Sequence, residues 1–183
     1  MIRSYKIECL VVRKNKIGET DNRLTVLSKD QGLMIVLARG IRKINSRRSP
    51  HLDLLNHVKL YLAKGKTFDI VTDVEPLNHF SELKTHLSRI ACAYKMIELI
   101  NKLLPEKEEQ SLIFNRLLSD LHILNSAFTV DEIKLTEDFA NFLLMELGFL
   151  PRDKKLVGRV LDTVLEEVCE RKIQSNVLLS KLL

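Results

Sequence analysis

Several patterns are scarce in this 183-residue chain, and each scarcity argues against a class of protein. The three cysteines, Cys9, Cys92 and Cys169, lie far apart and form no CxxC pair, so we expect no disulfide framework and three inert thiols in a reducing cytoplasm. No apolar run approaches about 20 residues, so no membrane-spanning helix is expected. The first residues carry charges around a short apolar stretch without a small-residue cleavage site, which indicates a strand and not a signal peptide.

Motifs for catalysis are also missing. The chain has no GxxxxGK[ST] loop and no serine-centred nucleophile elbow, and its five histidines show no HxxxH or HxH spacing. Glu19 and Asp21 have a spacing that suits Mg²⁺ in a nuclease, but two carboxylates without a third ligand make a poor metal site. Beside Arg23, ion pairing or turn capping is the favoured interpretation. We therefore expect a binding protein that is not an enzyme, with no cofactor and no metal.

The charge that is present is distributed unevenly. Residues 1–80 hold 15 Lys and Arg against 8 Asp and Glu, a net charge of +7, whereas residues 81–183 hold 14 against 16, a net charge of −2. The two values add to the net charge of +5 for the whole chain. A basic first half on a nearly neutral second half suggests a polyanionic partner for the first half. A solvated basic surface without a partner is the alternative.

Hydrophobic periodicity changes at the same place in the chain. Up to Pro76 the apolar residues alternate or form short β-branched runs, and Gly32 supplies the turn after Lys29. Pro76 is expected to end the strands. Five strands are predicted, over residues 5–13, 23–28, 33–39, 55–63 and 67–74.

After Pro76 the spacing becomes helical. Helices are predicted from Leu83 to Pro105, over residues 112–124, from a capping box at Thr129 to Leu147, over 157–168 after a cap at Asp153, and after Ser175. The predicted fold class is therefore α+β: a five-stranded N-terminal barrel over residues 1–78 and an all-helical domain over 79–183. The strand count suits an OB-fold, a small barrel that binds single strands, and also an SH3-like barrel.

The segment between the third and fourth strands favours nucleic-acid binding. Five of the twelve residues 39–50 are Lys or Arg and none is acidic. Arginine forks match phosphate bidentately, and a basic loop can follow a bent backbone. A solvated loop is the alternative. With two smaller clusters, the candidate DNA-binding residues are Arg39, Arg42, Lys43, Arg47, Arg48, Arg13, Lys14, Lys16, Lys64 and Lys66.

These segments resemble the signature of the RecO family. The similarity lies in Gly18-Glu19-Thr20-Asp21 with Leu24-Thr25, in the turn Gly32, and in Ala38-Arg39-Gly40-Ile41-Arg42 with Ser46. It continues through Leu54–Leu62, Gly65 and Leu147-Gly148-Phe149, and Arg171–Ser175 is similar to the family's closing motif. The resemblance implies an OB-fold followed by a helical domain.

The resemblance also implies a function. Family members are recombination mediators that bind single- and double-stranded DNA and anneal complementary strands. They help to load RecA onto DNA coated by single-strand-binding protein (SSB), together with RecR, in the cytoplasm at the nucleoid. Many carry a four-cysteine zinc site after the position of Pro151. This chain has none there and is shorter than is usual, so a short form without structural zinc is expected.

A contact with the acidic, hydrophobic SSB tail would need an apolar groove with a cation. Our candidates for that site are Lys134, Phe139 and Phe142. Two other functions stay open from the residues alone. One is an OB-fold RNA-binding protein, and the other is an interaction scaffold that binds no nucleic acid.

Overall fold

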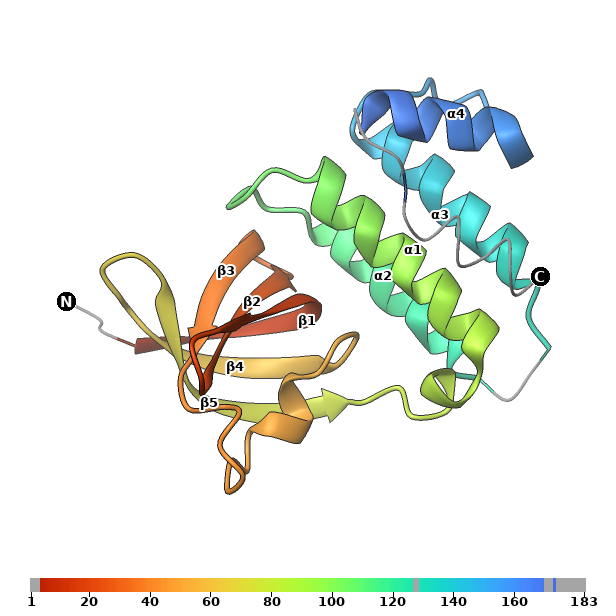
Figure 1. Cartoon of the computed structure of the whole chain (residues 1–183). Coiled ribbons are helices and arrows are strands. Elements are labelled where there is room, and N and C mark those ends of the chain that lie inside the picture. Colours follow the sequence, from red (N-terminus) through yellow and green to blue (C-terminus); the bar gives the residue numbers. More distant parts are fainter. Residues whose placement is uncertain (1–3, 127–128, 170–172, 174–183) are drawn as a thin grey trace. The chain divides into compact units, whose positions relative to one another are not determined.

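The five predicted strands form a closed barrel. The computed structural model (Figure 1) describes residues 4–126, 129–169 and 173. The barrel order is β1-β2-β3-β5-β4, and all neighbours are antiparallel except β3 and β5. The strands are β1 (Ser4–Ile17), β2 (Asp21–Ser28), β3 (Gly32–Ala38), β4 (His57–Ala63) and β5 (Asp69–Asn78). A short 3₁₀ helix, η1 (Ser49–Leu52), lies between β3 and β4. The predicted OB-type barrel followed by helices is confirmed.

Alternation along the strands builds the barrel core. Leu24 and Val26 of β2 and Val11 of β1 are fully buried members of one apolar cluster. Residues with the opposite parity, such as Arg23, face away from it. The β1–β2 register shifts between Val11 and Arg13, so this bulge lets β1 continue to Ile17. The strand is therefore longer than the alternation predicted.

Pro76 does not end the barrel, contrary to the prediction. β5 continues to Asn78, and Pro76 lies opposite Val58 of β4 next to a register irregularity. On its other side β5 pairs with β3 only at Asp69 and Ile70. A proline is tolerated there because no neighbouring strand needs its missing backbone N–H.

The helical part contains four α-helices among the described residues. They are α1 (Leu87–Leu103), α2 (Ser111–Leu124), α3 (Glu132–Glu146) and α4 (Gly158–Val168), preceded by the 3₁₀ turn η2 (Leu83–Thr85). The first helix thus starts four residues later than Leu83. The N-cap of α3 is Asp131, whose carboxylate accepts from the Lys134 backbone N–H, and not Thr129. The helix predicted after Ser175 lies outside the described residues.

The start of α4 is held by side chains of α3. Asn141 accepts from the Leu156 backbone N–H and donates to its carbonyl, both at 2.8 Å. The Glu137 carboxylate accepts from the Gly158 N–H at 2.8 Å. This contact satisfies a helix N-terminus that has no side-chain N-cap of its own, so the predicted cap Asp153 is wrong. Within the described residues, no helix is both long and apolar enough to cross a bilayer.

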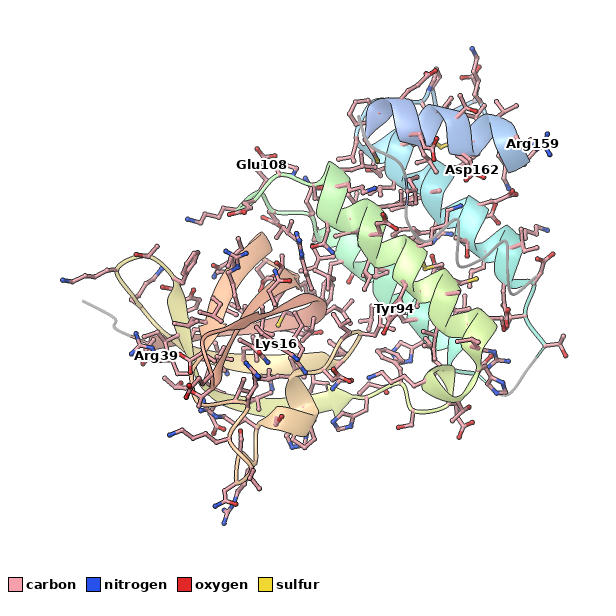
Figure 2. All side chains as sticks on the ribbon, viewed as in Figure 1. Lys16, Arg39, Tyr94, Glu108, Arg159 and Asp162 are labelled. Atoms are coloured by element: carbon pink, nitrogen blue, oxygen red, sulfur yellow. The ribbon has the colours of Figure 1, made fainter. Side chains whose placement is uncertain are left out.

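The chain divides into two compact units. One contains the residues up to His79 together with Pro105–Phe114, and the other contains Phe80–Leu104 together with the residues from Asn115 onward. In the first unit, Glu106 forms a parallel bridge with Leu33, and the Lys107 N–H donates to the Leu33 carbonyl at 2.9 Å. Figure 2 labels Glu108 in this connection between α1 and α2. The domain bounds predicted from the sequence, 1–78 and 79–183, remain a proposal.

Candidate nucleic-acid interface

The segment after β3 forms an exposed cationic loop, called the basic loop below (residues 39–48). The side chains of Arg39, Arg42, Lys43 and Arg47 are exposed, and Arg48 is half-buried. Figure 2 labels Arg39 at its start, on the barrel. Among the described residues, Arg39, Lys43 and Arg47 form no ion pair through their side chains. Those three cations are available to an anionic ligand.

Asp21 holds the start of the basic loop. Its carboxylate accepts from the Gly40 backbone N–H at 2.8 Å and from the Thr20 hydroxyl at 2.9 Å. Gly40 has φ +63°, a left-handed conformation that glycine adopts without strain. The Gly40 and Thr20 hydrogen bonds, with the charges of Arg39 and Lys43, lower the pKa of Asp21. Asp21 is thus a loop anchor, and Glu19 is exposed.

Two arginines of the basic loop bind the protein itself. Arg42 donates through Nη1 to the Gly18 carbonyl at 3.0 Å, and its backbone N–H donates to the Thr20 carbonyl. Arg48 donates to the carbonyls of Val71, Thr72 and Arg39 at 2.7, 3.2 and 3.0 Å. The Arg48 guanidinium therefore fastens the end of the loop to β5. The sequence pattern did not separate this arginine from its exposed neighbours.

The second predicted cluster lies near the basic loop. Lys16 pairs across the sheet with Asn22, and Asn22 pairs with Ala38, the residue before the loop. Two strand spacings, about 10 Å, separate Lys16 from Ala38. Arg13 and Lys16 are exposed, whereas Lys14 is half-buried and pairs with Asp53 at 3.2 Å.

The third predicted cluster lies at the other end of β1. Lys64 and Lys66 follow Ala63, which pairs with Ser4. The Lys64 ammonium is 3.7 Å from Asp69 and 4.8 Å from the centre of the Tyr5 ring. These two lysines border a hollow of about 570 Å³ that the Pro105–Phe114 segment helps to form.

A hydrogen-bond network orders the β4–β5 turn beside this hollow. The Tyr5 hydroxyl donates to Asp69, which also accepts from the Gly65 N–H at 3.1 Å. Burial and the bond to Asp69 raise the pKa of Tyr5. Burial acts to raise the pKa of Asp69, but the hydrogen bonds from Tyr5 and Gly65 and the charge of Lys64 lower it overall. Asp69 is therefore an anionic partner built into this cluster.

The three candidates for an SSB-tail contact do not form an open apolar surface. Lys134 is exposed, but Phe139 is fully buried in the helical unit. The Phe142 ring lies 5.2 Å from the Arg116 guanidinium. Because Phe139 is a core residue, these side chains do not support a groove in this structure, and the contact remains a prediction without structural support.

The cysteines and histidines of the chain lie outside the basic loop. In the described residues, no three or more His, Cys, Asp or Glu side chains gather where they could hold a metal ion. Cys9 and Cys92 are buried free thiols, and burial raises the pKa of each. One pair escaped the sequence analysis: His51 Nδ1 and His79 Nε2 lie 3.0 Å apart. These histidines are 28 residues apart in the sequence, so no short motif could have predicted that they meet.

The sequence of this chain is similar to a known family model and to known proteins. Residues 1–80 match the family model described as "Recombination protein O N terminal". The chain is 38% identical over 151 residues to the DNA repair protein RecO of Roseiflexus sp. (strain RS-1), covering 82% of this chain and 52% of that protein. It is 30% identical over 173 residues to the protein of the same name from Dehalococcoides mccartyi (strain ATCC BAA-2100), covering 94% and 64%.

The similarity covers most of this chain but only part of each relative. The chain spans 52% to 64% of the length of these curated relatives. The matched residues 1–80 include the whole barrel and the basic loop. The barrel of residues 1–80 is thus a RecO N-terminal domain, and the similarity to DNA repair proteins named RecO continues through most of the helical part.

Proposed function

We propose that this chain acts in recombinational DNA repair as a DNA-binding protein that holds DNA on the basic loop and uses no chemical step. The observation that carries the proposal is a set of exposed loop cations that form no ion pair within the described part of the chain: Arg39, Lys43 and Arg47. Support comes from the relatives, which are named DNA repair proteins. The residues of this set are proposed phosphate contacts, with Arg13 and Lys16 as neighbours.

The proposed mechanism rests on binding equilibria alone. A cationic surface that neutralises the phosphates of two strands lowers their mutual repulsion, so complementary strands meet and anneal faster. Counterion release supplies most of the free energy, which makes the binding strongly dependent on salt. From the family resemblance we also propose that the chain cooperates with RecR, contacts SSB, and so helps RecA to load onto SSB-coated strands.

The first test is binding of a labelled single-stranded DNA, followed by fluorescence anisotropy at several salt concentrations. Replacing Arg39, Lys43 and Arg47 together by alanine should reduce the slope of log K against log salt by about 2, because each phosphate contact on a single strand contributes about 0.7. An RNA of the same sequence serves as the control ligand. Equal slopes for the two proteins would contradict the assignment of the loop, and tighter binding of the RNA would contradict the choice of DNA.

The second test addresses annealing. Two complementary oligonucleotides, coated with SSB and labelled for energy transfer, should anneal faster with the chain present. The same triple alanine variant should lose that acceleration while its circular dichroism spectrum is unchanged. An acceleration that survives in the variant would place annealing elsewhere on the molecule.

A further inference from the structure

The tip of the basic loop carries an isoleucine that contacts almost nothing in the protein. Ile44 has a relative exposure of 103%, and the next most exposed large apolar side chain among the described residues, Leu112, has 63%. Ile41, three residues earlier, is 1% exposed and belongs to the barrel core. The core therefore explains one isoleucine of the loop and leaves the other without a structural role.

Local turn chemistry does not explain Ile44 either. The Ser46 N–H donates to the Lys43 carbonyl at 2.9 Å, so Ile44 and Asn45 are the central residues of a hydrogen-bonded turn. Asparagine is a common turn residue, whereas a β-branched side chain prefers a strand or a core. The turn would form as well with a polar residue in place of Ile44.

The loop presents this tip on an anchored support. Asp21 binds the backbone of Gly40, Arg42 binds the Gly18 carbonyl, and Arg48 binds three carbonyls at the end of the loop. Anchoring lowers the conformational entropy that is lost when a loop binds a ligand. Ile44 is thus held outward in a loop whose ends are already ordered.

The surroundings of Ile44 define the chemistry of a ligand. Lys43 and Arg47 lie on either side of the tip, and no acidic residue occurs in residues 39–50. A ligand that fits must place negative charges around an apolar face. A nucleic-acid strand has this arrangement, since its phosphates alternate with the flat faces of its bases.

We propose that Ile44 packs against the bases of a single DNA strand whose phosphates bind the cations of the basic loop. This inference rests on the proposed function. Isoleucine is among the apolar side chains that proteins insert between bases. In a duplex such insertion costs unstacking, whereas an unpaired strand offers its bases without that cost, so the single strand is the favoured ligand.

The aromatic residues of the barrel leave this role open. Tyr5 is bonded to Asp69, and the Tyr61 hydroxyl is bonded to Glu75. Phe68 lines the hollow at the β4–β5 turn, and the Ala63–Ser4 pairing places this turn at the opposite end of β1 from Lys16. Within the basic loop itself, the exposed apolar side chain that could contact bases is Ile44.

The absence of tryptophan from the chain allows a direct test. Ile44→Trp introduces a single tryptophan at the tip, and a base that packs on the indole should quench its fluorescence. The control is Leu77→Trp, at a partly exposed site on β5 outside the loop. On addition of single-stranded DNA we expect strong quenching of the first variant and little change in the second. Equal quenching in both, or in neither, while the DNA is bound would overturn the proposal.

A second measurement compares the wild-type tip with a serine variant, on an ordinary strand and on an abasic one. Ile44→Ser should weaken binding of single-stranded DNA by about fivefold to tenfold, the loss expected when one side chain is no longer partly buried. The salt slope should stay unchanged, because an apolar contact releases no counterions. An oligonucleotide with the same backbone but abasic sites should bind both proteins equally. A loss that is equal on the abasic strand would mean that Ile44 acts on the loop and not on bases.

The outcomes separate this inference from the proposed function. Wild-type binding to DNA with no effect of Ile44→Ser overturns the base contact and leaves the proposed function standing. Failure of the wild-type chain to bind DNA overturns both. Vesicles of anionic phospholipid are the remaining arm: a shift in the fluorescence of the Ile44→Trp variant with vesicles, but not with DNA, would assign the tip to a lipid surface instead.

Discussion

Two clusters of cations lie on the same barrel, and they differ in what surrounds them. The basic loop combines Arg39, Lys43 and Arg47 without an acidic residue in its own segment. The hollow at the β4–β5 turn combines Lys64, Lys66 and Lys107 with four acidic side chains, namely Asp30, Asp69, Glu106 and Glu109. Each of these two sets has three cations, but the hollow brings four carboxylates to its set, whereas Arg39 and Lys43 of the loop interact with the Asp21 carboxylate. The cations of the basic loop are therefore more available to a polyanion than the cations of the hollow.

The largest expected effect tests this difference directly. Changing Arg39, Lys43 and Arg47 to Glu should lower the affinity for single-stranded DNA at least about 100-fold, because three phosphate contacts become repulsions. Changing Lys64, Lys66 and Lys107 to Glu alters the net charge by the same amount, yet should lower the affinity less than about fivefold. Anisotropy at a fixed salt concentration measures both. If the two triple variants lose affinity equally, long-range charge matters and the arrangement of counterions does not.

The next prediction concerns the segment that supplies Glu106 and Glu109. Gly32 has φ +66°, and a Cβ at this position would lie 1.7 Å from the Glu108 carbonyl oxygen. Gly32→Ala should therefore lower the free energy of unfolding by about 3 kcal/mol, from backbone strain and steric overlap together. Gly18→Ala is the control, since Gly18 has φ +54° with nothing within 4 Å and should lose only about 1 kcal/mol. Urea denaturation followed by circular dichroism compares them. Equal losses would mean that the 105–110 segment does not depend on close contact with Gly32.

A smaller effect separates two neighbouring arginines. Arg48→Ala removes three hydrogen bonds to carbonyls and should lower the free energy of unfolding by about 2 kcal/mol. Arg47→Ala should change it by less than about 0.5 kcal/mol, as for an exposed surface residue. In DNA binding we expect the reverse order, with the salt slope reduced by about 0.7 in Arg47→Ala only. Thermal melts and salt titrations of both variants test these opposite orders of stability and DNA binding. A loss of stability in Arg47→Ala alone would contradict the prediction.

The smallest expected effect depends on pH. The folded chain lowers the pKa of Asp21 below its ordinary value of 3.8, so the carboxylate stabilises the fold above that pH. This contribution is lost as the pH falls through the folded-state pKa. Asp21→Asn keeps an oxygen that can accept from Gly40 and loses only the charge. Its deficit in unfolding free energy relative to wild type should be constant from pH 7 to about 5 and should shrink toward pH 3.

A companion variant checks the origin of that effect. Asp21→Ala removes the acceptor as well as the charge, so part of its deficit should persist at pH 3, where the asparagine variant approaches wild type. Melting temperatures measured over the same pH series compare the three proteins. A deficit of Asp21→Asn that grows on acidification would show that the sign of the Asp21 contribution is wrong.

Local patterns predicted most of the barrel because they carry its physical cause. Alternation in β2 and β3 places one face in the core, and the resulting strands differ from the predicted ones by at most two residues at each end. The strand ends in β1 and β5 were missed. The continuation of β1 depends on a bulge at Val12, and that of β5 depends on an edge where β3 does not pair with Pro76. Both depend on the neighbouring strand, which a local pattern does not contain.

Helix starts were predicted less well for a related reason. Asp131 caps α3 within its own segment, where the sequence signal was present but pointed to Thr129. The N-terminus of α4 is satisfied by Glu137, 21 residues away. A cap supplied from another helix leaves no mark beside the helix that it serves, so Asp153 was chosen instead.

By itself, the sequence determined the order of strands and helices, the concentration of positive charge in residues 1–80, and the acid-free character of the basic loop. These follow from side-chain type and spacing along a short stretch of chain. Only the tertiary structure decided which cations bind carbonyls or carboxylates of the protein, as Arg48 and Lys64 do, and which stay exposed, as Arg47 does. It also decided that Ile41 is buried and Ile44 is not. The reason is physical: burial and ion pairing depend on groups that approach from distant parts of the chain.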